Sequence, residues 1–111
     1  MNIDWAYMRK GWVSCKKAWT VFEKKSVSIK EEVDAKKQTY TGEDAWNVVA
    51  NADKICVASG KKIIEFNPAT ANKEDILKKI TGRTGNLRAP TFKSGNIFYV
   101  GYNTDMYDLF G

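Results

Sequence analysis

The chain has 111 residues, of which 43% are hydrophobic and 28% are charged, and its formal net charge is +5. This composition is typical of a globular chain long enough to bury one core, so a single domain over residues 1–111 is predicted. No apolar run approaches the roughly 20 residues that a membrane-spanning helix needs. The first residues carry an early acid and no small-residue cleavage site, so neither a membrane segment nor a signal peptide is expected.

The basic residues and the cysteines narrow the classes of partner. Lysines occur mostly in scattered pairs such as Lys16-Lys17 and Lys78-Lys79, whereas nucleic-acid binding needs basic residues clustered on one face. We therefore expect solvated surface and no nucleic-acid interface. The chain has no histidine and only two cysteines, Cys15 and Cys56, which argues against a metal site and against the disulfide framework of a secreted protein. A reduced, cytoplasmic protein without a cofactor follows.

The first third of the chain predicts a strand, a helix and a second strand. Apolar residues alternate within residues 2–8, which is the period of a strand. Helical spacing predicts a helix over residues 15–25, opened by Ser14 or a neighbour. Alternation returns within residues 26–34. Because a helix connects the two strands, they should be parallel.

Two helices and two apolar runs are predicted for the middle of the chain. Thr41 is predicted to be a hydroxyl N-cap with acids in the following turn. Asn72 should cap a second helix, which ends at Gly82 as a C-cap glycine. Between these helices, residues 55–58 and 63–66 form either a hairpin or two irregular strands.

The stretch from residue 83 to residue 100 combines a glycine loop, a proline and two strands. Pro90 has no N–H for a sheet ladder, so it should open a strand, and its X-Pro bond is the common type of cis candidate. Residues 97–100 are the most apolar run and should form a central strand. Thr104-Asp105 should cap a final short helix. This order of elements is that of the thioredoxin fold, in which a cis-proline faces a thiol motif on another loop.

The thiol motif would lie where the first strand meets the first helix, at Gly11-Trp12-Val13-Ser14-Cys15-Lys16. A C-x-x-C motif places its first cysteine at the helix N-terminus, where unpaired N–H groups and the helix dipole stabilise the thiolate. Its second cysteine, three residues later, resolves the mixed disulfide. Cys15 occupies the second position, and Trp12 replaces the first.

These motifs resemble the ArsC-like, Spx-like branch of the thioredoxin superfamily, and in particular small bacterial ArsC family (seleno)proteins. The resemblance covers nearly the whole chain. Its most specific segment is Thr84-Gly85-Asn86-Leu87-Arg88-Ala89-Pro90-Thr91, and the segment from Gly11 to Ala18 also matches. It implies an α/β, thioredoxin-like domain with a central mixed β-sheet flanked by helices and a mid-chain helical insertion.

The resemblance also implies a redox function. Relatives have cysteine or selenocysteine at the position of Trp12, and the UGA codon of selenocysteine differs by one base from the tryptophan codon. The hypothesis is that Trp12 stands where the native protein has selenocysteine. That residue would attack a disulfide or an oxidised substrate, and Cys15 would resolve the adduct. The partner would be a thiol or disulfide substrate or a glutathione-type donor. The alternative is that Trp12 is a native core or binding-surface residue.

The remaining site residues implied by the resemblance bind the substrate. Lys10, Lys16 or Lys17 would help to hold an anion, while Arg88 would lie with Ala89, Pro90 and Thr91 at the cis-proline loop. Arsenate itself is not expected, since the arsenate enzymes use a different, single-cysteine loop.

Each of these assignments has a structural alternative. Cys15 is otherwise a partly buried thiol in a first helical turn, and Arg88 an ordinary surface ion pair. Cys56 is expected to be a core thiol. At the level of function, the alternative is a non-catalytic interaction protein, like the Spx regulators, that binds a transcription component.

Overall fold

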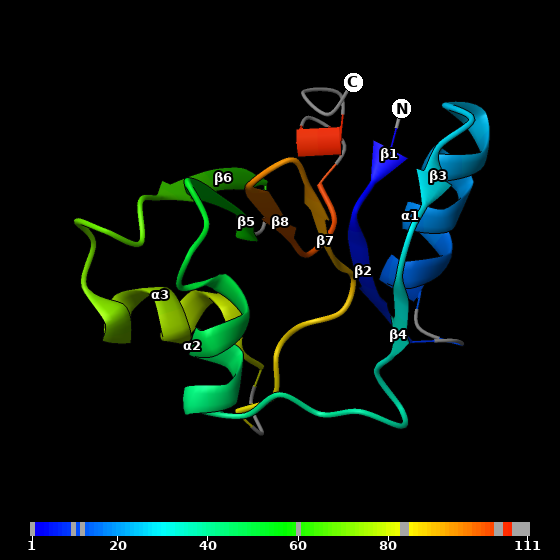
Figure 1. Ribbon diagram of the computed structural model, residues 1–111. Coiled ribbons are helices and arrows are strands. Elements are labelled where there is room, and N and C mark those ends of the chain that lie inside the picture. Colours follow the sequence, from blue (N-terminus) through cyan, green and yellow to red (C-terminus); the bar gives the residue numbers. More distant parts are fainter. Residues whose placement is uncertain are drawn as a thin grey trace.

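The computed structural model of the protein describes residues 2–9, 11, 13–59, 61–82, 85–103 and 106–107. Within these residues it has a mixed six-stranded sheet, a separate pair of short strands and three helices (Figure 1). The helices are α1 (Val13–Lys24), α2 (Glu43–Val49) and α3 (Lys73–Ile80). The strands are β1 (Asn2–Ile3), β2 (Trp5–Met8), β3 (Ser28–Ile29), β4 (Glu32–Asp34), β5 (Lys54–Ser59), β6 (Lys62–Phe66), β7 (Thr91–Ser94) and β8 (Ile97–Val100). The sheet order is β4-β2-β7-β8-β5-β6.

The first unit is the predicted strand–helix–strand. Strand β2 pairs with β4 in parallel, with Tyr7 opposite Val33, and β1 pairs with β3 in parallel, with Ile3 opposite Ile29. The prediction of parallel strands is therefore confirmed. The helix between them begins at Val13, two residues before the predicted start at Cys15.

The prediction for the start of α2 is wrong. Its N-cap is Gly42, which has a φ of 50° and makes no side-chain capping hydrogen bond. Thr41 lies one residue too early, and its backbone carbonyl accepts a hydrogen bond from the Asp44 N–H at 2.9 Å. Backbone geometry therefore satisfies this helix end without the Thr41 hydroxyl.

Helix α3 begins as predicted and ends differently. The Asn72 side-chain oxygen accepts a hydrogen bond from the Glu74 N–H at 2.8 Å, which confirms the N-cap. The C-cap is Thr81 in an extended conformation. Gly82 donates its N–H to the Asn86 carbonyl at 2.8 Å and belongs to the following turn, so its assignment as a C-cap glycine is wrong.

Residues 55–58 and 63–66 were predicted to form either a hairpin or two irregular strands, and the structure has the hairpin. Strands β5 and β6 form an antiparallel hairpin, and β5 pairs in parallel with β8, which joins this part of the chain to the sheet. Helices α2 and α3 are linked by the Lys73–Glu43 ion pair, and the Lys73 ammonium lies 5.7 Å from the centroid of the Trp46 ring.

Strands β7 and β8 are the two strands predicted within residues 83–100, and they form a hairpin around Gly95, whose φ is 63°. Strand β8 lies between β7 and β5, so its predicted central position is confirmed. The predicted cap at Thr104-Asp105 lies outside the described residues. Next to them, the Asn103 side-chain oxygen accepts a hydrogen bond from the Met106 N–H at 3.1 Å.

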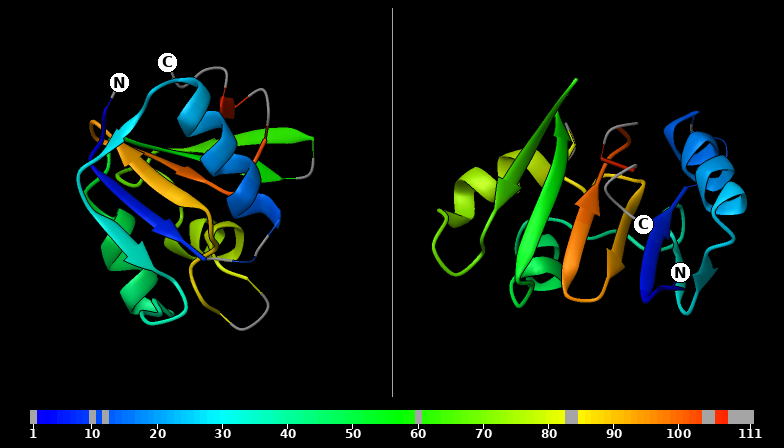
Figure 2. Two further views of the ribbon diagram at one scale, coloured as in Figure 1. Left: turned by 90° about the vertical axis from the view of Figure 1, so that its right-hand side faces the viewer. Right: turned by 90° about the horizontal axis from the view of Figure 1, so that it is seen from above.

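The two faces of the sheet are covered by different helices, with α1 in front of the sheet and α2 behind it in the left view of Figure 2. On the α1 face, Phe92 contacts Phe22 of the helix with ring centroids 5.2 Å apart. On the other face, Trp5 and Tyr7 project from β2 toward Tyr40, which precedes α2. Burial of rings on both sides stabilises the fold by about 1.5–3 kcal/mol for each fully buried side chain.

Candidate functional site

Cys15 lies in the first turn of α1, shortly after the chain passes from β2 into this helix. The Arg9 N–H, one residue beyond β2, donates a hydrogen bond to the Cys15 Sγ at 3.3 Å. The thiol is only 1% exposed. Burial raises the pKa of the Cys15 thiol, and the hydrogen bond from Arg9 acts in the opposite direction but is the smaller effect. Cys15 is therefore a protonated, shielded thiol at neutral pH.

Pro90 lies at the same end of the sheet as Cys15. The Ala89–Pro90 peptide bond is cis, as predicted. Strand β7 begins at the next residue, and Thr91 lies opposite Tyr7 of β2. Continuing this antiparallel register by one residue brings Pro90 beside Met8, the neighbour of Arg9. The proline loop, which leads into β7, and Arg9, which follows β2 and binds the Cys15 thiol, therefore lie at the same end of two adjacent strands.

Arg88 is bound to the protein's own backbone. Its Nη1 donates hydrogen bonds to the Ala58 carbonyl at 3.0 Å and to the Lys79 carbonyl at 3.2 Å. Burial lowers the pKa of the Arg88 guanidinium. These contacts connect the end of α3 and strand β5 to the proline loop, a structural role that sequence reasoning did not foresee.

The other predicted substrate-binding residues differ in exposure. Ala89, Pro90 and Thr91 are all buried, and the Thr91 hydroxyl donates to the Arg88 carbonyl at 2.6 Å. Lys16 is exposed on the outer side of α1. Trp12, the predicted redox position, lies outside the described residues, as does Lys10.

Tyr107 is a neighbour of Cys15 and packs against Tyr102, and the sequence analysis did not associate either tyrosine with the thiol. Burial raises the pKa of the Tyr107 hydroxyl, and the neighbouring Cys15 thiol is the second cause. The Tyr107 hydroxyl donates to the Gly101 carbonyl at 3.2 Å. Tyr102 packs on Tyr107 with ring centroids 4.9 Å apart. The Lys17 ammonium lies over the Tyr102 ring, 5.7 Å from its centroid. Only the apolar spacing of residues 106 and 107 hinted that this segment packs inward.

This end of β2 thus joins a buried thiol, a proline loop and an aromatic cluster. No family model, curated protein or solved structure matches the chain. The chemistry of the site must therefore follow from its own side chains. Among the described residues, no group of cysteines and carboxylates is arranged to hold a metal ion, and no helix is both long and apolar enough to cross a bilayer.

The second cysteine is separate from this site. Cys56 lies in β5, opposite Tyr99 of β8 and Glu65 of β6. Burial raises the pKa of the Cys56 thiol. Both cysteines are free thiols, and Cys56 has the buried position predicted for a core thiol.

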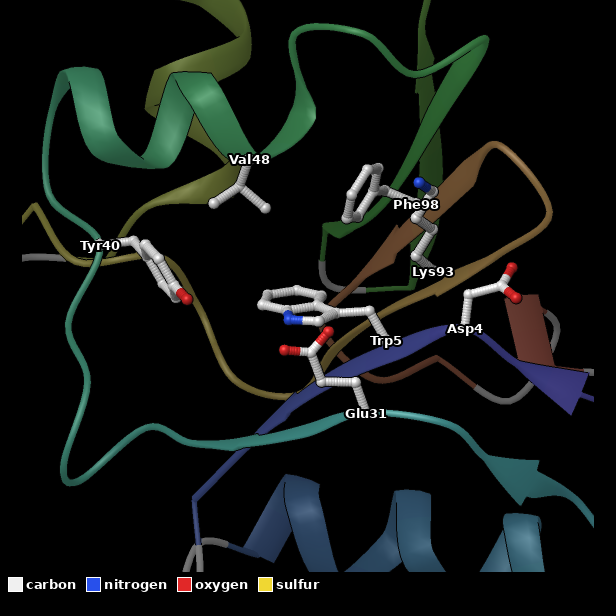
Figure 3. A pocket seen from close by; sticks show the side chains of 7 residues that line it. All are labelled: Asp4, Trp5, Glu31, Tyr40, Val48, Lys93 and Phe98. Atoms are coloured by element: carbon white, nitrogen blue, oxygen red, sulfur yellow. The ribbon is translucent and has the colours of Figure 1, made fainter.

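A hollow in the surface lies on the opposite face of the sheet from Cys15. It has a volume of about 350 Å³ and is bordered by β2, β7, β8 and the segments around α2 (Figure 3). Its lining residues are Asp4, Trp5, Glu31, Tyr40, Val48, Lys93 and Phe98. None of them was singled out as a site residue, because the pocket forms only when four distant segments meet.

Proposed function

We propose that this protein is a thiol- or selenol-disulfide oxidoreductase of the glutaredoxin and ArsC type, with a thioredoxin-like fold. The strand order β4-β2-β7-β8 supports the fold, since it combines a parallel β2–α1–β4 unit with an antiparallel β7–β8 hairpin. The observation that carries the proposal is the position of Cys15 at the β2–α1 junction, at the same end of the sheet as the Pro90 loop. In this proposal the β5–β6 hairpin and helices α2 and α3 are the insertion.

The burial of Cys15 supports a resolving role and argues against an attacking one. Thiol–disulfide exchange starts with an accessible thiolate. Cys15 is 1% exposed and its pKa is raised, so it cannot readily begin an attack on a substrate. The attacking atom belongs three residues earlier, at position 12. The residues on either side of that position, Gly11 and Val13, are exposed.

The proposed reaction transfers two electrons to a disulfide. A thiolate or selenolate at position 12 attacks one sulfur of the substrate, forms a mixed bond to it and releases the other sulfur as a thiolate. Cys15 then loses its proton to solvent and attacks the atom at position 12. A bond forms between the two protein side chains, and the second substrate thiolate leaves. Two molecules of an external thiol return the oxidised pair to its reduced state.

The identity of residue 12 in the native protein is part of this proposal. A tryptophan side chain has no nucleophile for exchange, so the chain with Trp12 has little or no activity of this kind. Selenocysteine at position 12, read as tryptophan, accounts for both the resemblance and the substitution. Sequencing of the native gene tests this directly. A UGA codon at position 12 supports the idea, and a UGG codon contradicts it.

The mechanism is tested by restoring a nucleophile. Trp12→Cys is expected to reduce a small mixed disulfide with turnover, whereas the chain with Trp12 is not. Adding Cys15→Ser to Trp12→Cys should leave an adduct that only external thiol can release. Adding Cys56→Ser instead is the matched control and should leave turnover unchanged, since Cys56 is buried in the sheet. Equal activity of the Cys15→Ser and Cys56→Ser double variants would show that Cys15 does not resolve the adduct.

The alternative function is a non-catalytic, Spx-like protein that binds a transcription component. Val13 is 67% exposed at the start of α1, beside the exposed Lys16 and Lys17. A single exposed apolar side chain is common on protein surfaces, so Val13 serves here as the position at which partner binding is tested. Loss of binding to purified RNA polymerase in Val13→Ser, with an inactive Trp12→Cys variant, would favour this reading over the redox enzyme.

A further inference from the structure

The pocket on the α2 face has walls that are largely aromatic. The Trp5 ring lies between Tyr40 and Phe98, with ring centroids 6.1 Å from each. The two flanking rings are inclined to the indole by 66° and 70°, so they form walls beside a flat surface. Val48 of α2 closes the side facing the helix (Figure 3).

The charge of the pocket is opposite to that of the whole protein. Two carboxylates, Asp4 and Glu31, and one ammonium, Lys93, line it, although the chain carries a net charge of +5. Asp4 accepts a hydrogen bond from the Gly95 N–H at 2.9 Å and lies 4.0 Å from the Lys30 ammonium. No lysine or arginine of the described residues lies within ion-pair distance of Glu31.

Glu31 and Tyr40 define one end of the pocket. Figure 3 shows the Glu31 carboxylate directed toward the Trp5 indole, with Tyr40 at the same end and Asp4 and Lys93 at the other. Glu31 is fixed beside β2, because its carbonyl accepts a hydrogen bond from the Ala6 N–H at 2.9 Å. The pKa of the Tyr40 hydroxyl is raised by burial and then by the charge of Glu31, which places this carboxylate near the ring.

We infer that this pocket binds a small organic cation, whose ammonium lies against the Trp5 and Tyr40 rings and is balanced by Glu31. Aromatic faces attract cations through their quadrupole, and trimethylated ammonium groups suit such surroundings because they cannot use hydrogen bonds. The volume of about 350 Å³ is at the low end of the range for small-molecule sites, roughly 300–1,000 Å³. The pocket does not depend on Cys15, which lies across the sheet.

The position of Lys93 decides at which end of the pocket a cationic ligand binds. Its ammonium lies 5.8 Å from the centroid of the Phe98 ring, so this ring already has a cation beside it. A ligand cation is therefore directed to the Glu31 end, away from Lys93. Replacing Lys93 by methionine keeps the aliphatic stem and removes a like charge. Cation binding should then tighten by about twofold to fivefold.

The test is a titration of the full chain with choline, followed by the amide NMR signals of Trp5, Glu31 and Tyr40. Saturable shifts with a Kd on the order of 1 mM or tighter are expected. The control ligand is 3,3-dimethylbutan-1-ol, which has the shape of choline and no charge. It should bind much more weakly, because only the cation gains from the rings and from Glu31.

Matched variants locate the site. Glu31→Gln should weaken choline binding roughly fivefold, the effect of one charge about 4 Å away in water. Glu32→Gln removes the neighbouring, exposed carboxylate outside the pocket and should have no effect. Tyr40→Leu should weaken binding by about twofold to fivefold. The amide spectrum of each variant shows whether it is folded.

Three outcomes would overturn the inference. The first is the absence of saturable shifts with choline. The second is equal affinity for choline and its neutral analogue, which would indicate an apolar hollow only. The third is an equal effect of Glu31→Gln and Glu32→Gln, which would indicate general charge attraction.

Discussion

At Gly101, the absence of a side chain decides how closely Arg88 can pack. This glycine has a φ of +83°, and a Cβ placed on it would lie 2.7 Å from the Arg88 Nη2 and 3.3 Å from the Ala58 Cβ. The guanidinium cannot easily move away, because its Nη1 is held by the carbonyls of Ala58 and Lys79. Gly101 thus satisfies two needs at once, a left-handed backbone and space for a bound arginine.

Gly101→Ala is therefore expected to lower the free energy of unfolding by about 2–4 kcal/mol. The left-handed conformation costs roughly 1–2 kcal/mol, and displacing Arg88 adds to that the weakening of its hydrogen bonds. Gly95→Ala is the control, because Gly95 also has a positive φ, of +63°, but open space around its Cβ position. It should show the backbone cost alone. Urea denaturation measures both, and equal losses would mean that the contact with Arg88 is unimportant.

The buried thiol of Cys15 gives a pH dependence with a definite sign. Its pKa is raised in the folded protein, so the unfolded chain loses this proton first as pH rises. The contribution to stability is complete below the unfolded pKa of about 8.5 and is lost as pH rises through the folded pKa. Cys56 and several tyrosines titrate in the same direction. The free energy of unfolding of Cys15→Ser should therefore fall less steeply with pH above pH 8.5 than that of the parent chain. The two slopes should differ by up to about 1.4 kcal/mol per pH unit. Parallel curves would show that Cys15 is not shielded.

At the scale of single elements, the caps of α2 and α3 form a natural comparison. The Asn72 side chain accepts a hydrogen bond from the Glu74 N–H, whereas α2 begins at Gly42 without a side-chain cap. Asn72→Ala should lower the free energy of unfolding by about 1 kcal/mol. Thr41→Ala should change it by less than about 0.5 kcal/mol. Chemical denaturation distinguishes the two, and a larger effect at Thr41 would contradict the capping pattern.

The same two helices show what sequence reasoning reaches at this scale. The periodicity of apolar residues predicted the strands and helices, and the N-cap of α3 followed from Asn72 and the acids after it. The same pattern at Thr41 gave a wrong prediction, because Gly42 adopts a φ of 50° and the helix starts one residue later. The prediction of Gly82 as the C-cap of α3 was wrong because the chain leaves this helix in an extended conformation, in which Thr81 pairs with Leu87. Both errors arise because long-range contacts determine the backbone conformation at these two helix ends.

At the scale of the whole molecule, the contacts that build the sites join segments far apart in the chain. The junction of β2 with α1 and the Pro90 loop were predicted to converge from the resemblance to the thioredoxin superfamily, in which a cis-proline faces a thiol motif on another loop. The position of Tyr107 near Cys15 and the ring cluster of Trp5, Tyr40 and Phe98 were not. Neither follows from local spacing, since each depends on the strand register and on where α2 folds back.

Arg88 is the residue whose role these long-range contacts redefine, and its substitution separates a structural role from a substrate contact. Arg88→Met removes two hydrogen bonds from a charged donor to backbone carbonyls. We expect a loss of about 2–4 kcal/mol in the free energy of unfolding, since such bonds contribute roughly 1.5–3 kcal/mol each and some water replaces them. Amide hydrogen exchange should quicken in α3 and β5 but not in β2 or β4, because the carbonyls that Arg88 binds belong to α3 and β5. Arg88→Lys keeps the charge but not the planar fork, so its loss should be intermediate.

The same variants are then assayed in a Trp12→Cys background to test the substrate contact directly. If Arg88 acts only through the fold, its Lys variant keeps the parent KM at temperatures where it is fully folded, and turnover falls only as the protein unfolds. A KM that rises severalfold in the folded Arg88→Lys variant would instead show that the guanidinium binds the substrate. Unchanged stability in Arg88→Met would contradict the structural role outright, because the Ala58 and Lys79 carbonyls would then have lost their charged donor at no cost.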